Sequence, residues 1–554
     1  MFNQLGQLSI LMKQRHAIKL PLSNATPSWQ LVVLGAIVGL IAAFAIVAMR
    51  HSIEAIQLYF NLGHHDSFGK DGQLTRMLAP LIGALFIVLL AFIFHQKYHR
   101  MGIPFVLHRQ RKFYGFIPIG NTINQFFSAI AALASGFSVG KEGPAVHVGA
   151  GSASYLSQVL NIPHNATRIL TSCGIAAGIS ATFNAPLAAV VFVLEVVLQQ
   201  YRVHSFLPLM VASLIGSTVS QQFFGDNHDY AHIAITTLKL DSIGPFIVLG
   251  IIVGTAATLF NRSLLGIMKM SSRMKMEIRL PLAGCIVGII AWFIPHVVGT
   301  EAGALNIAFS EQPELSFIVL VLVGKFLATV CALGLGIPGG VIGVLYALGA
   351  LLGSVIVWSL MPYIPSISPY ATMAIMICMV ALMASSLNAP LAALVAILEI
   401  SQQATIIFPS LLVVVPAIII AQQLFGTRSL FIEQLELQKL PYKTAPVLSS
   451  LQDTGVLSLM RRKYHCVQRF NADQSNEISK PIFVQPAPNT AQYFSPHAIE
   501  PLPTLYDNAT LADVYEVLAP IRNGYVLIVT QGTNELIGFV TWRSLSKHLH
   551  REYE

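Results

Sequence analysis

Two charged side chains, Lys141 and Glu142, stand alone in a long apolar part of the chain. The nearest Asp, Glu, Lys or Arg residues along the sequence are Lys112 and Arg168. Glycines flank the pair, and Pro144 follows at a position that suits the first turn of a helix. Because the N-terminal end of a helix attracts anions, a carboxylate placed there can occupy the position of a bound anion. We therefore predict that Glu142 gates an anion pathway, rather than only forming a structural ion pair with Lys141.

The composition indicates a membrane protein with several spans. Hydrophobic residues make up 54% of the 554 residues and charged residues only 10%, whereas about a quarter of the residues in a soluble domain are charged. A helix needs about 20 apolar residues to cross a bilayer, but many apolar segments here are shorter or interrupted by Gly and Pro. This pattern predicts an all-α polytopic fold in which broken and tilted helices line a pathway.

The basic residues are distributed as in a membrane protein rather than a nucleic-acid-binding protein, although the net charge is +8. They gather before the first apolar segment, after the second and beyond the last, which is the positive-inside pattern. We expect residues 1–30 to be a cytoplasmic N-terminal segment, since they lack the compact apolar core of a signal peptide. Both termini are then cytoplasmic, the surrounding partner is membrane lipid, and the membrane is the inner (plasma) membrane of a bacterium.

The apolar region contains an internal repeat. The string Asn-Ala-Pro-Leu-Ala-Ala occurs at 184–189 and again at 388–393, and each copy is followed by a glutamate, Glu195 or Glu399. The glycines around the gate recur at nearly the same offset, with Ile342 at the position that corresponds to the gate carboxylate. Interrupted helices at corresponding positions of two halves indicate a transport site where half-helix N-termini face an anion. We assign both glutamates structural roles, because intramembrane charges commonly pair within the bundle.

Residues 436–554 have the composition of a small soluble α/β domain, which we expect to be cytoplasmic and regulatory. The segment Thr510–Asp513 is typical of a capping box that opens an amphipathic helix. Residues 525–530 and 536–541 are predicted to be strands joined by a turn, and Ser544 to start the last helix.

Together these motifs resemble the CLC family of chloride channels and proton-coupled chloride transporters over residues 31–435. Gly-Lys-Glu-Gly-Pro at 140–144 is similar to the family's gating motif, and Gly-Ile-Pro-Gly-Gly-Val-Ile at 336–342 stands in the expected order between the two Asn-Ala-Pro-Leu strings. The resemblance implies a homodimer with one pathway per subunit for chloride or another small anion. It also implies an inverted repeat, here about 31–225 and 240–435.

The segment at about 504–549 resembles a CBS module, a regulatory unit that often follows the membrane domain of CLC proteins. Such modules sometimes bind adenine nucleotides, so an adenine nucleotide is a candidate ligand, and we expect no metal. Residues 440–500 fit a partner module poorly, so we expect one clear copy and one degenerate copy.

The resemblance also places the functional positions, and this chain departs from the family pattern at several of them. Met101 stands where the family has a serine, and Phe431 stands where it has a pore tyrosine, after a one-residue shift of the alignment. Val196 follows Glu195 where proton-coupled members often carry a second glutamate, so the usual proton-relay position is lost. The anion-binding set implied by the resemblance is Met101, Gly102, Ile103, Gly340, Val341, Ile342 and Phe431.

Without two side-chain donors, each worth on the order of 1.5–3 kcal/mol to an anion, the central site should bind chloride weakly. We therefore expect a CLC-type anion transport protein that is channel-like or only loosely coupled to protons. Two alternatives stay open within transport: a proton/anion antiporter, and a transporter of another anion such as fluoride, because the fluoride-exporting branch also departs at the serine position. A membrane sensor with little flux is an alternative of another class. An enzyme is not expected, because the sequence shows no nucleophile–base set or metal-ligand cluster.

Overall fold

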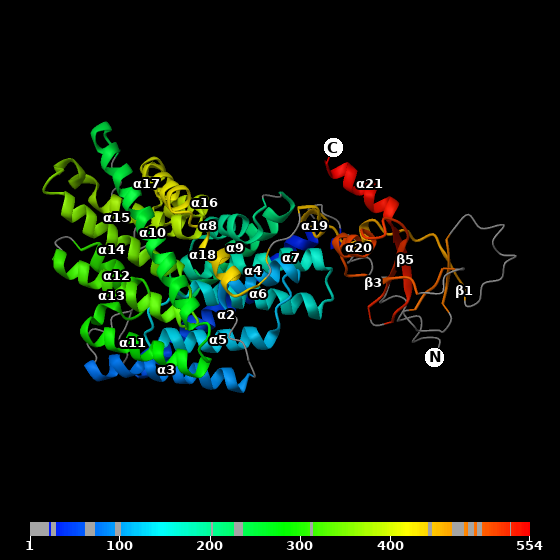
Figure 1. Ribbon diagram of the computed structural model, residues 1–554, viewed down its shortest axis with the longest axis horizontal. Coiled ribbons are helices and arrows are strands. Elements are labelled where there is room, and N and C mark those ends of the chain that lie inside the picture. The colour runs from blue at the N-terminus through cyan, green and yellow to red at the C-terminus, as the bar shows by residue number, and fades with distance from the viewer. Residues whose placement is uncertain are drawn as a thin grey trace. The chain divides into compact units, whose positions relative to one another are not determined.

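The computed structural model divides the chain into two compact units. The first comprises residues 34–155 and 171–442 and is built almost entirely from helices (Figure 1). The second comprises the described residues of 1–33, 156–170 and 443–554. The predicted N-terminal segment, 1–30, lies almost entirely outside the described residues. These are 22–23, 29–60, 72–94, 101–200, 203–225, 237–310, 314–440, 442, 446–467, 481–485, 492–495, 501–531 and 533–553.

Eight helical segments in the described part of the chain are long and apolar enough to cross a membrane. The predicted polytopic, mostly helical class is therefore confirmed. The eight segments are α2 (Trp29–Tyr59), α3 (Gln73–Ile93), α10 (Ile243–Ser271), α11 (Met276–Phe293), α13 (Leu315–Gly334), α14 (Ile342–Leu360), Ile367–Leu387 with α15 (Ala371–Leu387), and Ala404–Leu424 with α17 (Ile407–Ile419).

The other helices of this unit are shorter or less apolar, and they carry the candidate site. They are α4 (Gly102–Lys112), α5 (Ile119–Ala134), α6 (Glu142–Val159), α7 (His164–Phe183), α8 (Pro186–Phe192), α9 (Val203–Phe224), α12 (Ala302–Ala308), α16 (Pro390–Ser401) and α18 (Leu430–Leu437), with π-helical turns η2 (Val193–Leu198) and η7 (Ile420–Leu424).

Close packing of α3 against α11 shows how these helices associate (Figure 1). A side chain on Gly284 would overlap the backbone of Leu81, and one on Gly288 would overlap the carbonyl of Met77. Because lipid tails are as apolar as the helices, burying apolar surface does not drive helices together in a membrane. Their association depends instead on the close approach of two backbones at small residues.

The two halves of the helical unit repeat the same backbone turns. α6 begins at Glu142 and α14 begins at Ile342, which are the corresponding positions of the sequence repeat. Asn184 and Asn388 both adopt positive φ angles, 54° and 57°, immediately before the two Ala-Pro strings. A left-handed backbone is uncommon for a residue with a side chain, so its recurrence at both asparagines agrees with the predicted duplication.

The glutamates that follow the two repeated strings hold the halves together. Glu399 accepts hydrogen bonds from the backbone N–H groups of Leu187 (2.8 Å) and Ala188 (2.7 Å) at the start of α8. Glu195 accepts the equivalent pair from the start of α16, at 3.1 and 2.7 Å. The C-terminal end of each helix thus lies at the N-terminal end of the other, as an inverted repeat requires. Carboxylates that accept first-turn N–H groups stabilise helix starts, which is a structural role of the kind predicted for both glutamates.

The second unit contains the small α/β domain that the sequence predicts. Strand β3 (Thr504–Tyr506) pairs in parallel with β4 (Tyr525–Val529), which pairs antiparallel with β5 (Leu536–Thr541). Helix α20 (Leu511–Leu518) follows β3, and the Thr510 N–H donates to Asp513 Oδ2 (2.7 Å) in the expected capping box. The remaining elements are α19 (Pro446–Leu451), β1 (His465–Val467), β2 (Ile482–Val484) and α21 (Trp542–Tyr553).

The last helix begins at Trp542 rather than at the predicted Ser544. The N–H of Ser544 donates to Thr541 Oγ1 (3.1 Å), and the N–H of Thr541 donates to Ser544 Oγ (3.2 Å). This reciprocal pattern makes Thr541 the capping residue, with Ser544 inside the first turn. The serine therefore takes part in the cap from within the helix rather than preceding it.

Candidate functional site

The carboxylate of Glu142 is enclosed by glycines. Its side chain is completely buried at the start of α6. A Cβ atom on Gly140 or Gly340 would overlap Oε2 of Glu142, and one on Gly343 would lie 2.5 Å from Oε1. Only residues without side chains leave room for the carboxylate at this position. We call Gly140, Gly340 and Gly343 the glycine cradle.

Backbone hydrogen bonds join the two halves of the repeat at this cradle. The Gly140 N–H donates to the Gly340 carbonyl (2.8 Å), and the Gly340 N–H donates to the Gly140 carbonyl (2.6 Å). Two corresponding glycines of the repeat therefore pair directly with each other. The pairing places the starts of α6 and α14 together, and with them the two motifs predicted to form the anion pathway.

Neither carboxylate oxygen of Glu142 has a hydrogen-bonding partner of normal geometry among the described residues. The neighbouring Lys141 directs its Nζ to Oε1 of Glu301, 3.3 Å away. A buried carboxylate without a fixed partner is costly. Such a group is suited to exchange places with an anion or to bind a proton, which are the two properties that a gate requires.

A cavity of about 100 Å³ lies next to the cradle. Because Gly340 belongs to both the cradle and the cavity lining, the gate carboxylate adjoins this space. Ile342 is buried at the start of α14 and is the one predicted anion-binding residue outside the lining. Six of the predicted set line the cavity: Met101, Gly102, Ile103, Gly340, Val341 and Phe431.

One predicted backbone donor is already in use. The N–H of Gly102, at the start of α4, points to Gln125 Oε1 (3.0 Å) and His147 Nδ1 (3.2 Å). Both of these side chains are completely buried. Gly102 thus shapes the cavity, while its N–H fixes α4 against α5 and α6. The histidine after the gate is a hydrogen-bonded residue, the role that side chains of this kind usually have.

Two side-chain amides that were not predicted from the sequence, those of Gln434 and Gln438, also line the cavity. Gln434 is buried, and its Nε2 contacts only the soft sulfur of Met268 at 3.6 Å among the contacts resolved for it. An amide nitrogen carries two hydrogens, so it has donor capacity toward the cavity. The sequence could have identified Gln434 from its spacing. It follows Phe431 by three residues, and residues three apart on a helix share a face.

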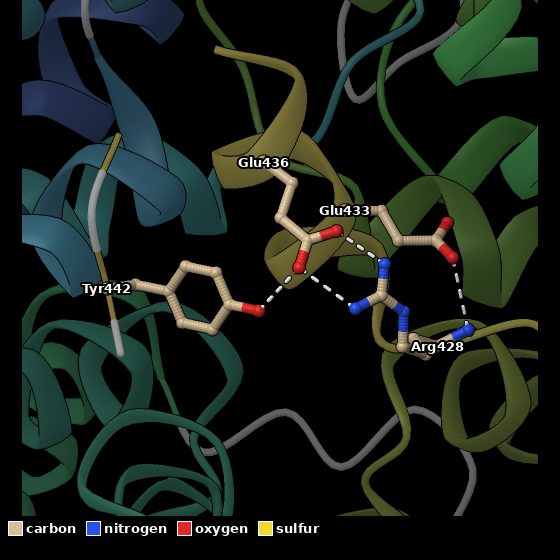
Figure 2. A network of polar contacts seen from close by, with 4 residues as sticks. All are labelled: Arg428, Glu433, Glu436 and Tyr442. Carbon is tan, nitrogen blue, oxygen red and sulfur yellow. Dashed lines mark hydrogen bonds and ion pairs between the residues drawn. The ribbon is translucent and has the colours of Figure 1, made fainter. Parts of the chain in front are cut away.

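A polar network outside the candidate spans holds α18 in place (Figure 2). Arg428 binds Glu436 with both terminal nitrogens, one at 2.9 Å, and its backbone N–H donates to Glu433 (3.2 Å). The Tyr442 hydroxyl donates to Glu436 Oε1 (2.6 Å). Removal from water and this hydrogen bond to Glu436 both raise the pKa of Tyr442. The network joins the residues before and after α18, and so orients the helix that carries Phe431 and Gln434.

Val196 lies in a π-helical turn, η2. The orientation of neighbouring residues is therefore not the roughly 100° step of an α-helix. Val196 is buried, and Glu195 beside it accepts two backbone hydrogen bonds from α16. The carboxylate nearest to the lost relay position is thus engaged in joining the two repeats.

A second cavity, of about 520 Å³, reaches Lys141 and Glu301 but not Glu142. We call this space the vestibule. Its other charged lining residues are Arg50, Glu54 and Glu399. Glu301, at the start of α12, was missed by the sequence analysis, because nothing near it in the chain resembles the gate motif.

The second unit, which contains the small α/β domain, has a cavity of about 1200 Å³. Tyr525 and Trp542 contribute aromatic rings to its lining. Guanidinium and ammonium groups bind phosphate well, so the lining fits the phosphates of the nucleotide suggested by the sequence. Its basic residues are Arg461, Arg462, Lys463, Arg543 and Lys547.

Residues 82–422 match the family model described as voltage gated chloride channel. The H+/Cl− exchange transporter ClcA of Vibrio parahaemolyticus serotype O3:K6 is 25% identical over 470 residues, 78% of this chain and 96% of that protein. The putative chloride channel protein ClcB-like of Ralstonia nicotianae is 27% identical over 398 residues, 69% of this chain and 91% of that protein. The family match covers more than half of the chain.

Solved structures share the fold, and three of them are as follows. A slow cyanobacterial Cl−/H+ antiporter has a TM-score of 0.64 at 23% identity, and the match covers 74% of this chain and 98% of that one. A eukaryotic CLC transporter has a TM-score of 0.63 at 16% identity, over 93% of this chain and 97% of that one. A CLC-type fluoride/proton antiporter has a TM-score of 0.60 at 20% identity, over 75% and 98%. At these identities the likeness shows the fold alone.

Proposed function

The chain belongs to the voltage-gated chloride channel family, and from that premise we propose that it conducts small anions, chloride first, under the control of Glu142. The observation that carries this proposal is the completely buried Glu142 carboxylate in the glycine cradle, next to the cavity lined by the predicted anion-binding residues. An anion that enters the cradle takes the position of the carboxylate, where the N-terminal end of α6 favours negative charge. Protonation of Glu142 removes the competing charge and opens the pathway.

We further propose that anion flow is uncoupled from protons or only loosely coupled. Obligatory exchange needs a proton route from both sides of the membrane to the gate, along ionisable groups or water. At the relay position the chain carries Val196, and the adjacent Glu195 is bonded to the start of α16. The usual proton route of the family therefore has no free carboxylate at the position of Val196.

Parallel recording of anion and proton movement in sealed liposomes tests this proposal. An imposed chloride gradient is expected to drive rapid anion flux without stoichiometric uphill proton movement. Repeating the assay with fluoride and nitrate ranks the anions. A fixed proton-to-anion ratio that survives changes in membrane voltage would replace the channel-like mechanism with coupled exchange.

Coupled exchange is the second candidate mechanism, and the relatives favour it. The Vibrio relative is named as an H+/Cl− exchanger, and two of the structural neighbours are antiporters. One of these is a fluoride/proton antiporter, which keeps fluoride as an alternative substrate. A membrane sensor, the candidate of another class, would show no anion flux in the same liposomes.

The cavity departs most from the family pattern in the side chains that would donate hydrogen bonds to the anion. Met101 and Phe431 offer no strong donor, whereas the amide of Gln434 lines the same space. We propose that Gln434 supplies a hydrogen bond to the anion in place of the missing hydroxyl groups. A neutral amide donor contributes less than a full set of donors would, so the site remains weak for chloride.

Replacing Met101 with serine is expected to tighten chloride binding by roughly tenfold, because one hydrogen bond to an anion contributes about 1.5–3 kcal/mol. Isothermal titration of chloride into the purified protein measures the change. The matched variant Gln434→Leu removes a donor from the lining of the same cavity and should weaken binding in the same assay. Equal affinities for wild type and Met101→Ser would mean that residue 101 does not reach the anion.

The setting of this pathway follows from the charge distribution and the apolar surface. Large apolar side chains are exposed along the candidate spans, for example Phe86 and Phe92 of α3, which suits contact with lipid. We propose an inner-membrane homodimer with both termini in the cytoplasm, on the positive-inside pattern. The C-terminal unit, with its basic cavity, is then a cytoplasmic CBS-like regulator that can take a phosphate-bearing ligand such as an adenine nucleotide.

A further inference from the structure

A second carboxylate, that of Glu301, lies beside the gate, and its side chain is 12% exposed. A Cβ atom placed on Gly343 would lie 2.5 Å from Oε1 of Glu142 and 2.6 Å from Oε2 of Glu301. The two carboxylates therefore face the same glycine, within the ~4–6 Å over which like charges alter each other's protonation. Oε2 of Glu301 is buried without a hydrogen-bonding partner of normal geometry among the described residues, like both oxygens of Glu142.

The charge balance at this position favours one shared proton. Lys141 lies 3.3 Å from Glu301 Oε1 and supplies one positive charge to the two carboxylates. With both carboxylates ionised, the trio carries a net negative charge inside a poorly solvated region, which is costly. One proton on the pair makes the trio neutral, and two carboxylates that share a site commonly hold a single proton in this way.

Access to water differs between the two carboxylates. The vestibule reaches Glu301 and Lys141, whereas Glu142 is completely buried and does not line it. A proton that enters from the vestibule thus meets Glu301 first. Direct contact or a single intervening water is sufficient for transfer between two such groups.

The backbone before Glu301 is held by a buried cation. Lys325, on α13, is completely buried and donates to the carbonyls of Val297 (3.1 Å), Gly299 (2.8 Å) and Thr300 (2.6 Å). These bonds fix the turn that presents Glu301 to the gate. The titratable and charged groups around the pair, from every neighbouring element, are Arg50 and Glu54 of α2, Lys141, Lys325 of α13, Tyr346 of α14 and Glu399 of α16.

We propose that Glu142 and Glu301 share one proton, and that Glu301 passes protons between the vestibule and the gate. In the transfer, the O–H bond on Glu301 breaks and an O–H bond on Glu142 forms, so the charge of the pair is unchanged. The reverse transfer returns the proton from Glu142 to Glu301, which releases it to vestibule water as hydronium, so the pair never holds more than one proton. This inference rests on the proposed gating by Glu142, and it makes the pH of the vestibule side the control of anion flow without requiring a proton to cross the membrane.

The test is the pH dependence of anion flux in Glu301→Gln, with each side of the membrane titrated separately. Without the second negative charge, Glu142 holds its proton less readily, so more acid is needed to open the pathway. The pH midpoint of flux is expected to move by about one unit or more toward acid, because a neighbouring like charge commonly shifts protonation by this amount. The midpoint is read within one sample, so it does not depend on how much of the variant folds.

Two further variants keep the result specific. Lys141→Met removes the compensating cation and should move the midpoint in the opposite direction, toward alkaline pH. Glu314→Gln removes an exposed carboxylate that bonds to Ser316 and does not line the vestibule, and it should leave the midpoint unchanged.

The outcomes separate this inference from the proposed function. If wild-type protein conducts anions but Glu301→Gln and wild type share one pH midpoint, the shared proton is ruled out while the gate assignment stands. Shifts of Glu301→Gln and Lys141→Met in the same direction would also contradict it. If wild-type protein moves no anions at all, the proposed function itself fails.

Discussion

Replacing Glu142 with glutamine should raise anion flux at neutral pH by about tenfold or more and flatten its pH dependence. The change keeps the size of the side chain but removes the negative charge that competes with the anion, so an anion can displace the side chain from the glycine cradle. A tenfold rise corresponds to about 1.4 kcal/mol, which is small compared with the cost of an unpaired buried carboxylate. Glu142→Gln is therefore expected to conduct anions at every pH at the rate that wild type reaches only in acid.

Chloride efflux from liposomes, recorded from acid to neutral pH, measures this change. Glu314→Gln is a suitable control, because this exposed carboxylate precedes α13 and bonds only to Ser316 among its resolved contacts. The control should follow the wild-type pH profile. If Glu142→Gln retains both the wild-type rate and the wild-type profile, Glu142 is not the gate.

The second large effect is expected from Gly140→Ala. The three atoms nearest to an added Cβ all belong to the Glu142 side chain. The new methyl group must therefore push the carboxylate out of the cradle, since a flexible side chain moves more easily than backbone. The methyl group then occupies part of the space that an anion takes in the cradle, so flux in acid should fall well below that of wild type and its pH dependence should flatten. Gly340→Ala is a poorer choice, because its Cβ would also overlap the backbone nitrogen of Gly143.

A double-mutant cycle shows whether the effect passes through the carboxylate. In a Glu142→Ala background no carboxylate remains to be displaced, so Gly140→Ala should act there only by narrowing the cradle, and the two effects should be non-additive. Gly266→Ala is the matched control, because a Cβ there meets no atom within 4 Å, and it should conduct like wild type. Additive effects of Gly140→Ala and Glu142→Ala on flux would show that the glycine acts independently of the gate.

Local signals in the sequence were reliable where the structure depends on near neighbours. The start of α6 at Glu142 and the capping box at Thr510 each involve residues within a few positions of one another. The start of the last helix was misplaced because Ser544 takes part in its cap from inside the first turn. The resemblance placed Met101 and Phe431 together, and both line the cavity beside the cradle.

By itself, the sequence determined the membrane class, the duplicated halves, the small α/β domain and the position of Glu142 at a glycine-flanked helix start. These follow from composition, repeated strings and short-range motifs, which need no knowledge of distant contacts. Only the tertiary structure decided that Glu301 lies beside the gate, that Gln434 faces the cavity, and that the N–H of Gly102 is already bonded. The positions of Glu301 and Gln434 depend on the packing of the two halves against each other, whereas the Gly102 bond depends on the packing of α4 against α5 and α6 within the first half. No periodicity or spacing in the chain encodes such a contact, because it is set by the packing of whole helices.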